Sequence, residues 1–322
     1  MIMPGSPRSP YLVIDEFLPR DMALAMRADI DAHFAEPGQH RAESHQVWNY
    51  WFVPELYAYL RTAPEKVIRR ELVQMFADAL KGWSIERLGM AQVTWPYLSL
   101  YVPGCRQGLH NDTINGRFGF VYSLTLDERK TSGGETIILH EGDPFRSKLT
   151  TPAAGRGLYD AVAPRFNRLI VFDDRLPHAV ERIEGVMDPR EGRFVLHGHL
   201  GESGWIVAGP LPPQTLLAVV TAALETGTAS LREQDGAAGA APLAAHHGPF
   251  TLRIQIAPEG HVAFSQLVMD RVVSPLGDES RWLTAREEIM AAIAGCVFPA
   301  APAPTIAIMP MLFGGAPPAG AR

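Results

Sequence analysis

The sequence lacks the features of several large protein classes. Only two cysteines, Cys105 and Cys296, occur among its 322 residues, which excludes a disulfide framework and a cysteine-based zinc site. No run of basic residues is present and the formal net charge is -6, so we expect no nucleic acid partner. No stretch is apolar for long enough to span a bilayer, and prolines and an arginine interrupt the N-terminal residues where a secretory segment needs an apolar core. We therefore expect a cytoplasmic protein with no membrane partner.

The first part of the chain, to about residue 85, has the pattern of helices. Thr62 and Glu65 match a capping box, which predicts that a helix starts there. Four apolar residues then recur at intervals of four: Ile68, Leu72, Phe76 and Leu80. They share one helix face, which we expect to pack on a flat surface. Residues 48–59 are rich in aromatics and would cover the back of a sheet or form a lid over a substrate.

From Ala91 the sequence changes to short segments rich in aromatic and β-branched residues, separated by Gly, Pro, Asn and Asp. These segments are QVTWPYLSLYV, GFVYSLTL, ETIILH, RLIVFDD and RFVLHGHL. Several strands at close spacing after a helical part predict an α+β protein, in which an antiparallel sandwich or jelly roll is buttressed by N-terminal helices.

The composition changes again after residue 207, where Pro, Gly and Ala become frequent. The composition of residues 208–249 predicts a linker that contains a short helix at about 215–232. Residues 250–322 predict two strands, a helix opened by a capping box at Thr284 and Glu287, and a last strand. The expected organisation is a main domain at 1–207, the linker, and a small ββαβ domain at 250–322.

His110 and Asp112 lie in the glycine-flanked segment GLHNDTINGRF and are the first candidates for chemistry. Alternate residues of an extended strand point to one face, so both side chains can ligate a single cation. The same pair also fits a polar strand end before a turn, in which Asn115 and Gly116 supply positive backbone angles. The motif by itself leaves both interpretations open.

Two further residues strengthen the metal interpretation. His178 follows Pro177 at the end of an apolar strand, where it can approach the first pair as a third ligand. Two histidines and one carboxylate leave open coordination positions, the arrangement of non-haem Fe(II) oxygenases. Arg193 begins another strand and can grip the distal carboxylate of a dicarboxylate through two parallel hydrogen bonds, although a lone arginine is more often a surface charge.

Five motifs in this order resemble the prolyl 4-hydroxylase-like branch of the Fe(II)- and 2-oxoglutarate-dependent dioxygenases. They are Y-x-x-G at 101–104, H-x-D at 110–112, G-G-E-T at 133–136, P-H-x-V at 177–180 and G-R-x-x-L around 193–196. The resemblance covers residues from about 10 to about 200. It implies a double-stranded β-helix in that part of the chain.

The resemblance also implies roles for individual residues. His110, Asp112 and His178 would bind Fe(II), Arg193 would bind the C5 carboxylate of 2-oxoglutarate, and Tyr101 would line the cosubstrate pocket. The implied reaction consumes O2, releases succinate and CO2, and hydroxylates an unactivated C–H bond of a peptide, an amino acid, another small molecule or a carrier-bound substrate. L-ascorbate is a further expected cofactor. Asp112 argues against halogenation, because related halogenases leave the carboxylate position empty for chloride.

Several nearby residues keep two interpretations. Alternation places His197 and His199 on the face of Arg193, either as hydrogen-bonded structural histidines or as substrate contacts. Arg168 or Arg175 would replace Arg193 as the cosubstrate anchor if the long loop before Arg193 places it badly.

Other functions also stay open. The C-terminal segment is weakly similar to the C-terminal domain of TonB-like proteins, which suggests that it binds a protein or peptide partner. One alternative function is a catalytically silent metal-binding jelly roll that acts as an interaction module, and the intact ligand set speaks against it. Another is a metallo-hydrolase or cupin-type isomerase with the same ligands, which would not need Arg193.

Overall fold

The computed structural model describes residues 6–35, 47–139, 159–227, 245–273 and 279–314. The chain divides into two compact units. The large-sheet unit consists of Pro10–Trp83 and Gln92–Gly201, and the small-sheet unit of Met1–Ser9, Ser84–Ala91 and Glu202–Arg322. Among the described residues, no helix combines the length and the apolar character needed to cross a membrane.

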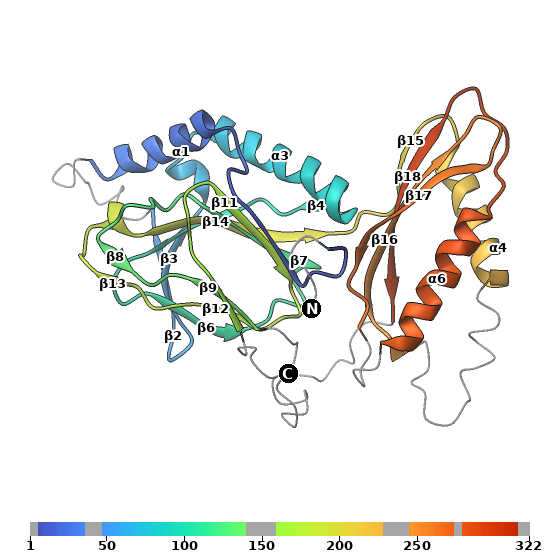
Figure 1. Cartoon of the computed structure of the whole chain (residues 1–322). Helices are drawn as coiled ribbons and strands as arrows, with labels where there is room; N and C mark the ends of the chain where they lie inside the picture. Colours follow the sequence, from blue (N-terminus) through green and yellow to red (C-terminus); the bar gives the residue numbers. More distant parts are fainter. Residues whose placement is uncertain (1–5, 36–46, 140–158, 228–244, 274–278, 315–322) are drawn as a thin grey trace. The chain divides into compact units, whose positions relative to one another are not determined.

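A curled antiparallel sheet of 12 strands forms the large-sheet unit (Figure 1). Its main path is β1-β11-β7-β14-β5-β3-β6-β12-β9-β10, with β2 beside β3 and β4 beside β14. The strands are β1 (Tyr11–Ile14), β2 (Asn49–Val53), β3 (Tyr57–Thr62), β4 (Gln92–Val93), β5 (Tyr97–Tyr101), β6 (Arg106–His110), β7 (Phe118–Ser123), β9 (Thr136–Leu139), β10 (Tyr159–Val162), β11 (Arg168–Asp173), β12 (His178–Val180) and β14 (Arg193–Gly201). A separate pair joins β8 (Thr131–Ser132) to β13 (Glu184–Gly185). This mixed architecture with a large curled sheet agrees with the expected jelly roll.

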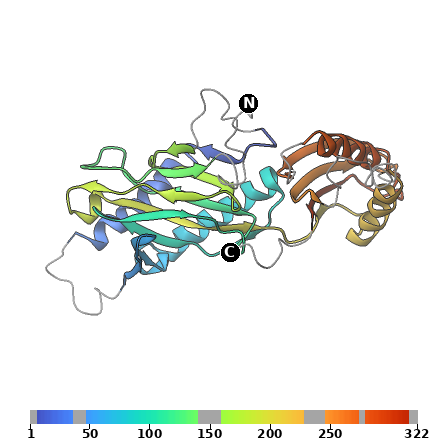
Figure 2. The ribbon, with the colours of Figure 1, turned by 90° about the horizontal axis from the view of Figure 1, so that it is seen from below.

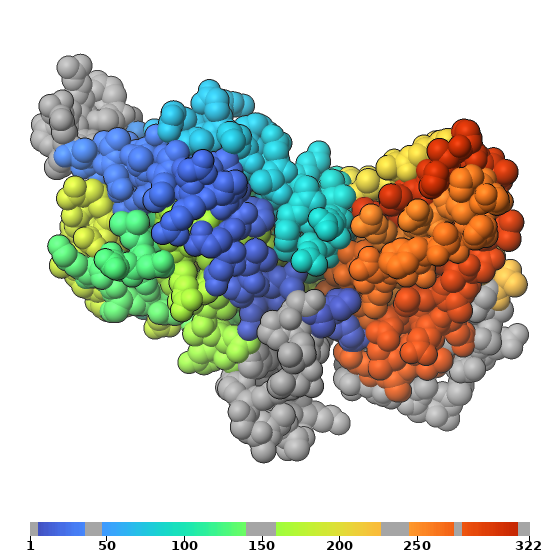
Figure 3. All heavy atoms as spheres, turned by 45° about the horizontal axis from the view of Figure 1, so that its top comes forward, coloured from blue at the N-terminus to red at the C-terminus, as the bar shows by residue number. Residues whose placement is uncertain are grey.

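Helices α1 (Arg20–His33) and α3 (Arg70–Leu88) lie over one face of the large sheet (Figures 1 and 2). Their atoms lie side by side on the surface seen in Figure 3. Phe76 of α3 is fully buried, and its ring stacks on Tyr122 at 4.8 Å and lies 6.0 Å from Phe120. Tyr122 and Phe120 alternate along β7, so their side of the sheet faces the helices and the other side is left for different side chains.

The prediction of a mainly helical N-terminal part is wrong for the strands β1, β2 and β3. β2 and β3 form a hairpin within the aromatic segment 48–59, and β3 also pairs with β5 and β6. The capping box at Thr62 is wrong as well, because α3 begins only at Arg70, after the short 3-10 helix Pro64–Lys66. The hydroxyl of Thr62 instead donates to the carbonyl of Val47 at 2.5 Å. This tertiary contact, which the local sequence does not reveal, holds Thr62 in a strand.

The small-sheet unit contains four strands in the order β15-β18-β16-β17. Its elements are β15 (Ile206–Ala208), α4 (Pro213–Gly227), β16 (Gly248–Ile256), β17 (Val262–Asp270), α6 (Ser280–Ala294) and β18 (Thr305–Phe313). The buried ring of Trp282 packs against Phe250 and Phe313. Thr284 does not open α6, because it lies inside the helix and its hydroxyl donates to the carbonyl of Ser280 at 3.2 Å. A separate ββαβ domain stays a prediction, since β15 and α4 belong to the same unit.

Truncation of the Phe76 side chain tests the packing between α3 and the sheet. Phe76→Ala is expected to lower the free energy of unfolding by about 3–5 kcal/mol, because it leaves a cavity between buried rings. Met75 is 52% exposed on the same helix, so Met75→Ala should change stability by no more than about 0.5 kcal/mol. Chemical denaturation followed by tryptophan fluorescence measures both, and equal losses would contradict the packing.

Candidate functional site

The candidate site lies on the face of the large sheet that points away from α1 and α3. Leu196 of β14 pairs with Tyr122, whose ring faces the helices. Arg193 is an odd number of residues from Leu196 and therefore points to the opposite face, together with its partner Tyr101 on β5. His178 of β12 pairs with His110 of β6 on this face. The curl of the sheet thus brings together residues that are far apart in sequence.

His110, Asp112 and His178 form a cluster with the geometry of a metal site. Their candidate ligand atoms all lie within 4.8 Å of one another. Oδ2 of Asp112 is 3.4 Å from Nε2 of His178 and 3.8 Å from Nε2 of His110. A transition-metal ion about 2.0–2.2 Å from each atom fits among donors at these separations.

Hydrogen bonds to the backbone prepare both imidazoles for ligation. Nδ1 of His110 lies 2.8 Å from the carbonyl oxygen of Gly108, and Nδ1 of His178 lies 3.0 Å from that of Leu176. Because Nδ1 carries the proton in such a bond, Nε2 keeps its lone pair and points toward Asp112. Burial lowers the pKa of His110, with the charge of His178 acting in the same direction, which favours the neutral ligand form.

Gln107 connects this cluster to Tyr101. The pairing of β6 with β12 shifts between His178 and Val180, so Gln107 and His110 point to one face although they are three residues apart. The amide nitrogen of Gln107 lies 3.2 Å from Nε2 of His110, and its oxygen accepts a hydrogen bond of 3.1 Å from the Tyr101 hydroxyl. A metal ion bound to Nε2 of His110 would take the place of the Gln107 amide nitrogen beside that atom.

Asp112 is ionised and fixed in place. Burial alone would raise its pKa, but the hydrogen bond and charge of His178 and the charge of His110 outweigh this effect and lower the pKa to about 2. The amide of Asp112 donates to the carbonyl oxygen of Asp174 at 3.0 Å. The cluster therefore offers one carboxylate and two imidazole donors, the set that suits Fe(II) with open positions.

A second group of ligand-type residues shares Asp112 with the first and adds Asp174 and His199. Here Nδ1 of His199 lies 3.0 Å from Oδ2 of Asp174, so these two atoms are hydrogen-bonded to each other. Asp174 keeps His199 protonated more strongly, since the pKa of His199 is raised despite its burial. A protonated imidazole is a poor ligand. Of the two groups, His110, Asp112 and His178 therefore form the better candidate for a metal site.

The turn after Asp112 is not the one that we expected. Neither Asn115 nor Gly116 has a positive φ. The backbone amide of Asn115 instead donates to the carbonyl of Asp112 at 2.8 Å, and its side chain donates to Oδ1 of Asp112 at 3.1 Å. Gly116 is needed for space, because a Cβ there would lie 2.9 Å from the carbonyl oxygen of Leu200.

Arg193 is a buried cation that forms no ion pair with any carboxylate in the described part of the chain. Its side chain is 1% exposed, and none of the described carboxylates pairs with it within 4.0 Å. Nη2 donates to the Thr136 hydroxyl at 3.1 Å, Cζ lies 4.8 Å from the centroid of the Tyr101 ring, and Nε has no hydrogen-bond partner among the described residues. Burying such a charge costs several kcal/mol when no anion compensates it. The guanidinium is therefore suited to an anionic ligand.

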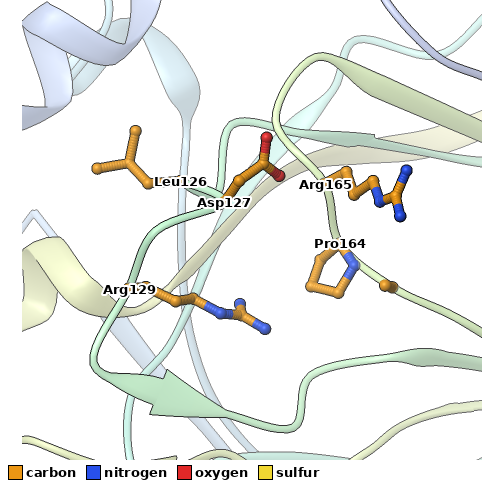
Figure 4. Close-up of a pocket in the computed structure, with 6 residues that line it drawn as sticks. Leu126, Asp127, Arg129, Pro164 and Arg165 are labelled. Atoms are coloured by element: carbon orange, nitrogen blue, oxygen red, sulfur yellow. The ribbon is translucent and has the colours of Figure 1, made fainter.

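The backbone beside Arg193 requires glycine. Gly134 has a φ of +81°, and a Cβ there would lie 2.9 Å from Cδ of Arg193. Arg129 donates to the carbonyl of the neighbouring Gly133 at 2.8 Å and projects into a hollow toward Pro164 (Figure 4). Burial lowers the pKa of Arg193, and the charge of Arg129 acts in the same direction. The two guanidinium groups of Arg193 and Arg129 therefore interact with each other at this end of the site.

The other arginines considered as anchors are already paired with carboxylates. Arg168 forms an ion pair with Asp15, and Arg175 forms one with Asp173 at 2.6 Å. Arg193 differs from both, which favours it as the ligand-binding arginine.

Sequence patterns missed two aromatic residues of the site. Tyr57 packs edge-on against His110 with ring centroids 5.4 Å apart, and Tyr59 stacks on Tyr101 at 5.1 Å. Both belong to β3. Their alternation in the segment YAYLRT was the available strand signal.

Known proteins are similar to this chain in structure only. No protein-family model matches it, and no curated protein matches its sequence. A prolyl-4-hydroxylase from Pseudomonas putida is 19% identical with a TM-score of 0.43, over 61% of this chain and 94% of that one. A prolyl hydroxylase from Trichoplax adhaerens, in complex with a hypoxia inducible factor oxygen degradation domain peptide fragment, is 14% identical with a TM-score of 0.42, over 58% and 81%. The similarity of the C-terminal segment to TonB-like proteins finds no support in these comparisons.

The pH dependence of stability tests the environment of His197, whose Nε2 lies 2.8 Å from the Ser99 hydroxyl. Burial, aided by the charge of Arg61, lowers its pKa to about 3. Between the unfolded pKa of about 6.5 and this folded pKa, the unfolded state binds more protons, so stability falls as the pH falls.

We expect His197→Asn to lose less stability than the wild type between about pH 7 and about pH 5, by on the order of 1 kcal/mol. Denaturant unfolding at the two pH values measures this difference. Identical losses in both proteins would contradict the lowered pKa of His197.

Proposed function

We propose that this chain is an Fe(II)- and 2-oxoglutarate-dependent dioxygenase that hydroxylates an unactivated C–H bond. The observation that carries the proposal is the buried guanidinium of Arg193, which forms no ion pair with a described carboxylate and lies on the same sheet face as His110, Asp112 and His178. A metal site alone would fit a hydrolase or an isomerase. A buried cation beside it fits a dicarboxylate whose far end must be anchored.

The protein's residues divide the work between two ends of the site. His110, Asp112 and His178 would hold Fe(II), while Arg193 and the Thr136 hydroxyl would hold the C5 carboxylate of 2-oxoglutarate. When bound together, iron and 2-oxoglutarate would activate O2, so that one oxygen atom enters succinate as CO2 is released and the other enters the hydroxylated substrate. Anchoring one end of the cosubstrate fixes its orientation toward the metal and lowers the entropic cost of reaction.

Apolar side chains would keep water from the cosubstrate. Tyr101, whose ring lies beside the Arg193 guanidinium, belongs to the buried cluster that also contains Tyr59, Cys105, Val180, Ile183 and Val195. A dry environment strengthens the ion pair between a guanidinium and a carboxylate. The substrate is a peptide, an amino acid, another small molecule or a carrier-bound group, with L-ascorbate as an assay reductant.

Spectroscopy under anaerobic conditions tests the proposed reaction. Fe(II) followed by 2-oxoglutarate should produce a weak visible metal-to-ligand charge-transfer band, and O2 should then release succinate. The paired variant Asp112→Ala with His178→Ala should lose the band, because it keeps one ligand only. An absent band in the wild type, or an undiminished band in the variant, would falsify the assignment.

Substitution of Arg193 tests the cosubstrate anchor separately from the metal. Arg193→Gln should weaken 2-oxoglutarate binding roughly 100-fold, the loss expected for charge-assisted hydrogen bonds worth about 3 kcal/mol. Metal affinity should stay unchanged, and stability without ligands should not fall because an uncompensated charge is removed. The exposed Arg20, paired with Glu16, provides the control Arg20→Gln. Equal 2-oxoglutarate affinity in Arg193→Gln and the wild type would move the anchor elsewhere.

A further inference from the structure

Arg61 lies between two aromatic rings near the candidate site. Its Cζ is 3.6 Å from the centroid of the Trp51 ring and 4.2 Å from that of Tyr97. Trp51 belongs to β2 and Tyr97 to β5, and these strands pair with opposite edges of β3. The rings remain accessible, with 41% of Trp51 and 47% of Tyr97 exposed.

The strand register places this group on the face of the metal ligands. Tyr57, Tyr59 and Arg61 are alternate residues of β3 and point to one side of the sheet. Tyr57 contacts His110, and Tyr59 stacks on Tyr101. Arg61 follows two residues further on, about 7 Å along the strand. It pairs across the sheet with Ser99, which is hydrogen-bonded to His197.

Among the residues that the structure describes, no carboxylate forms an ion pair with Arg61 within 4.0 Å, so its charge is not balanced by them. Its guanidinium does donate a hydrogen bond to the Tyr59 hydroxyl. Stacking between rings uses the flat faces of a guanidinium and leaves donors along its edge, where a planar carboxylate binds through two hydrogen bonds. The two rings also restrain the side chain, which reduces the entropy lost on binding.

We propose that Arg61 binds a carboxylate of the substrate while Trp51 and Tyr97 contact the apolar group next to it. This inference rests on the proposed dioxygenase function, because it places the substrate beside the metal. The substrate class is then a carboxylic acid with an adjacent apolar group, either a small acid or an acidic side chain of a peptide. Arg193 and Arg61 thus divide two carboxylates between them, one from the cosubstrate and one from the substrate.

Binding of defined probes tests this assignment. The full chain is loaded with Mn(II) and saturating 2-oxoglutarate, so that Arg193 is occupied. Calorimetry and ligand NMR then compare hippurate with its uncharged amide, hippuramide, and with N-acetyl-Asp-Phe-amide. We expect the wild type to bind at least one of the two acids tenfold or more tighter than hippuramide. Preference for hippurate identifies a small acid, and preference for the peptide identifies an acidic side chain.

Variants separate the effect of the Arg61 charge from the effect of its side-chain shape and from unspecific loss of structure. Arg61→Gln should abolish the preference for the acid, Arg61→Lys should retain part of it, and Arg20→Gln should leave it unchanged. Paramagnetic broadening of the bound probe by Mn(II) should confirm that it lies near the metal. Equal binding of acid and amide by the wild type, no binding of either acid, or an unchanged preference in Arg61→Gln would each overturn the proposal.

The same samples show whether the role of Arg61 or the proposed dioxygenase function is wrong. If Mn(II) and 2-oxoglutarate bind but the acid preference is absent, only the role of Arg61 is wrong. If the acid preference depends on Arg61 but 2-oxoglutarate does not bind, the carboxylate site stands and the dioxygenase assignment fails.

Discussion

The buried guanidinium of Arg193 is the constraint on which the account of this protein depends. A cation taken out of water without an anion is unfavourable, and among the described residues Arg193 contacts the Thr136 hydroxyl and the ring of Tyr101, and it also forms a side-chain hydrogen bond with Tyr101. Gly134 lies so close that a side chain there would collide with Arg193. The surroundings therefore hold the charge in place without neutralising it, which fits a site that is completed by an anionic ligand.

The grouping of the candidate ligands could be anticipated from sequence better than the residues that surround them. His110 and Asp112 are two residues apart, and His178 and Arg193 stand at strand ends, so alternation and order along the chain were enough to suggest one surface. Strands near the C-terminus were also predictable, since the segment that forms β18 is continuously apolar and bounded by prolines and glycines. Local patterns succeed where local periodicity and burial agree.

The remaining features depend on tertiary contacts. The hairpin of β2 and β3 places Tyr57 against His110, yet its segment also fits a lid or a covering layer until its pairing with β5 and β6 is known. The irregular pairing of β6 and β12 turns Gln107 toward His110, which strict alternation forbids. Thr62 and Thr284 match capping boxes but bond to distant or intrahelical carbonyls instead. Except for Thr284, whose partner lies in its own helix, a partner elsewhere in the fold overrides a local preference.

Anomalous diffraction from crystals grown with Mn(II) and 2-oxoglutarate tests the central claim most directly. We predict a metal peak at about 2.0–2.3 Å from Nε2 of His110, Nε2 of His178 and the Asp112 carboxylate, with the far carboxylate of 2-oxoglutarate on the guanidinium of Arg193. A peak between Asp174 and His199, or a 2-oxoglutarate carboxylate bound away from Arg193, would contradict the account.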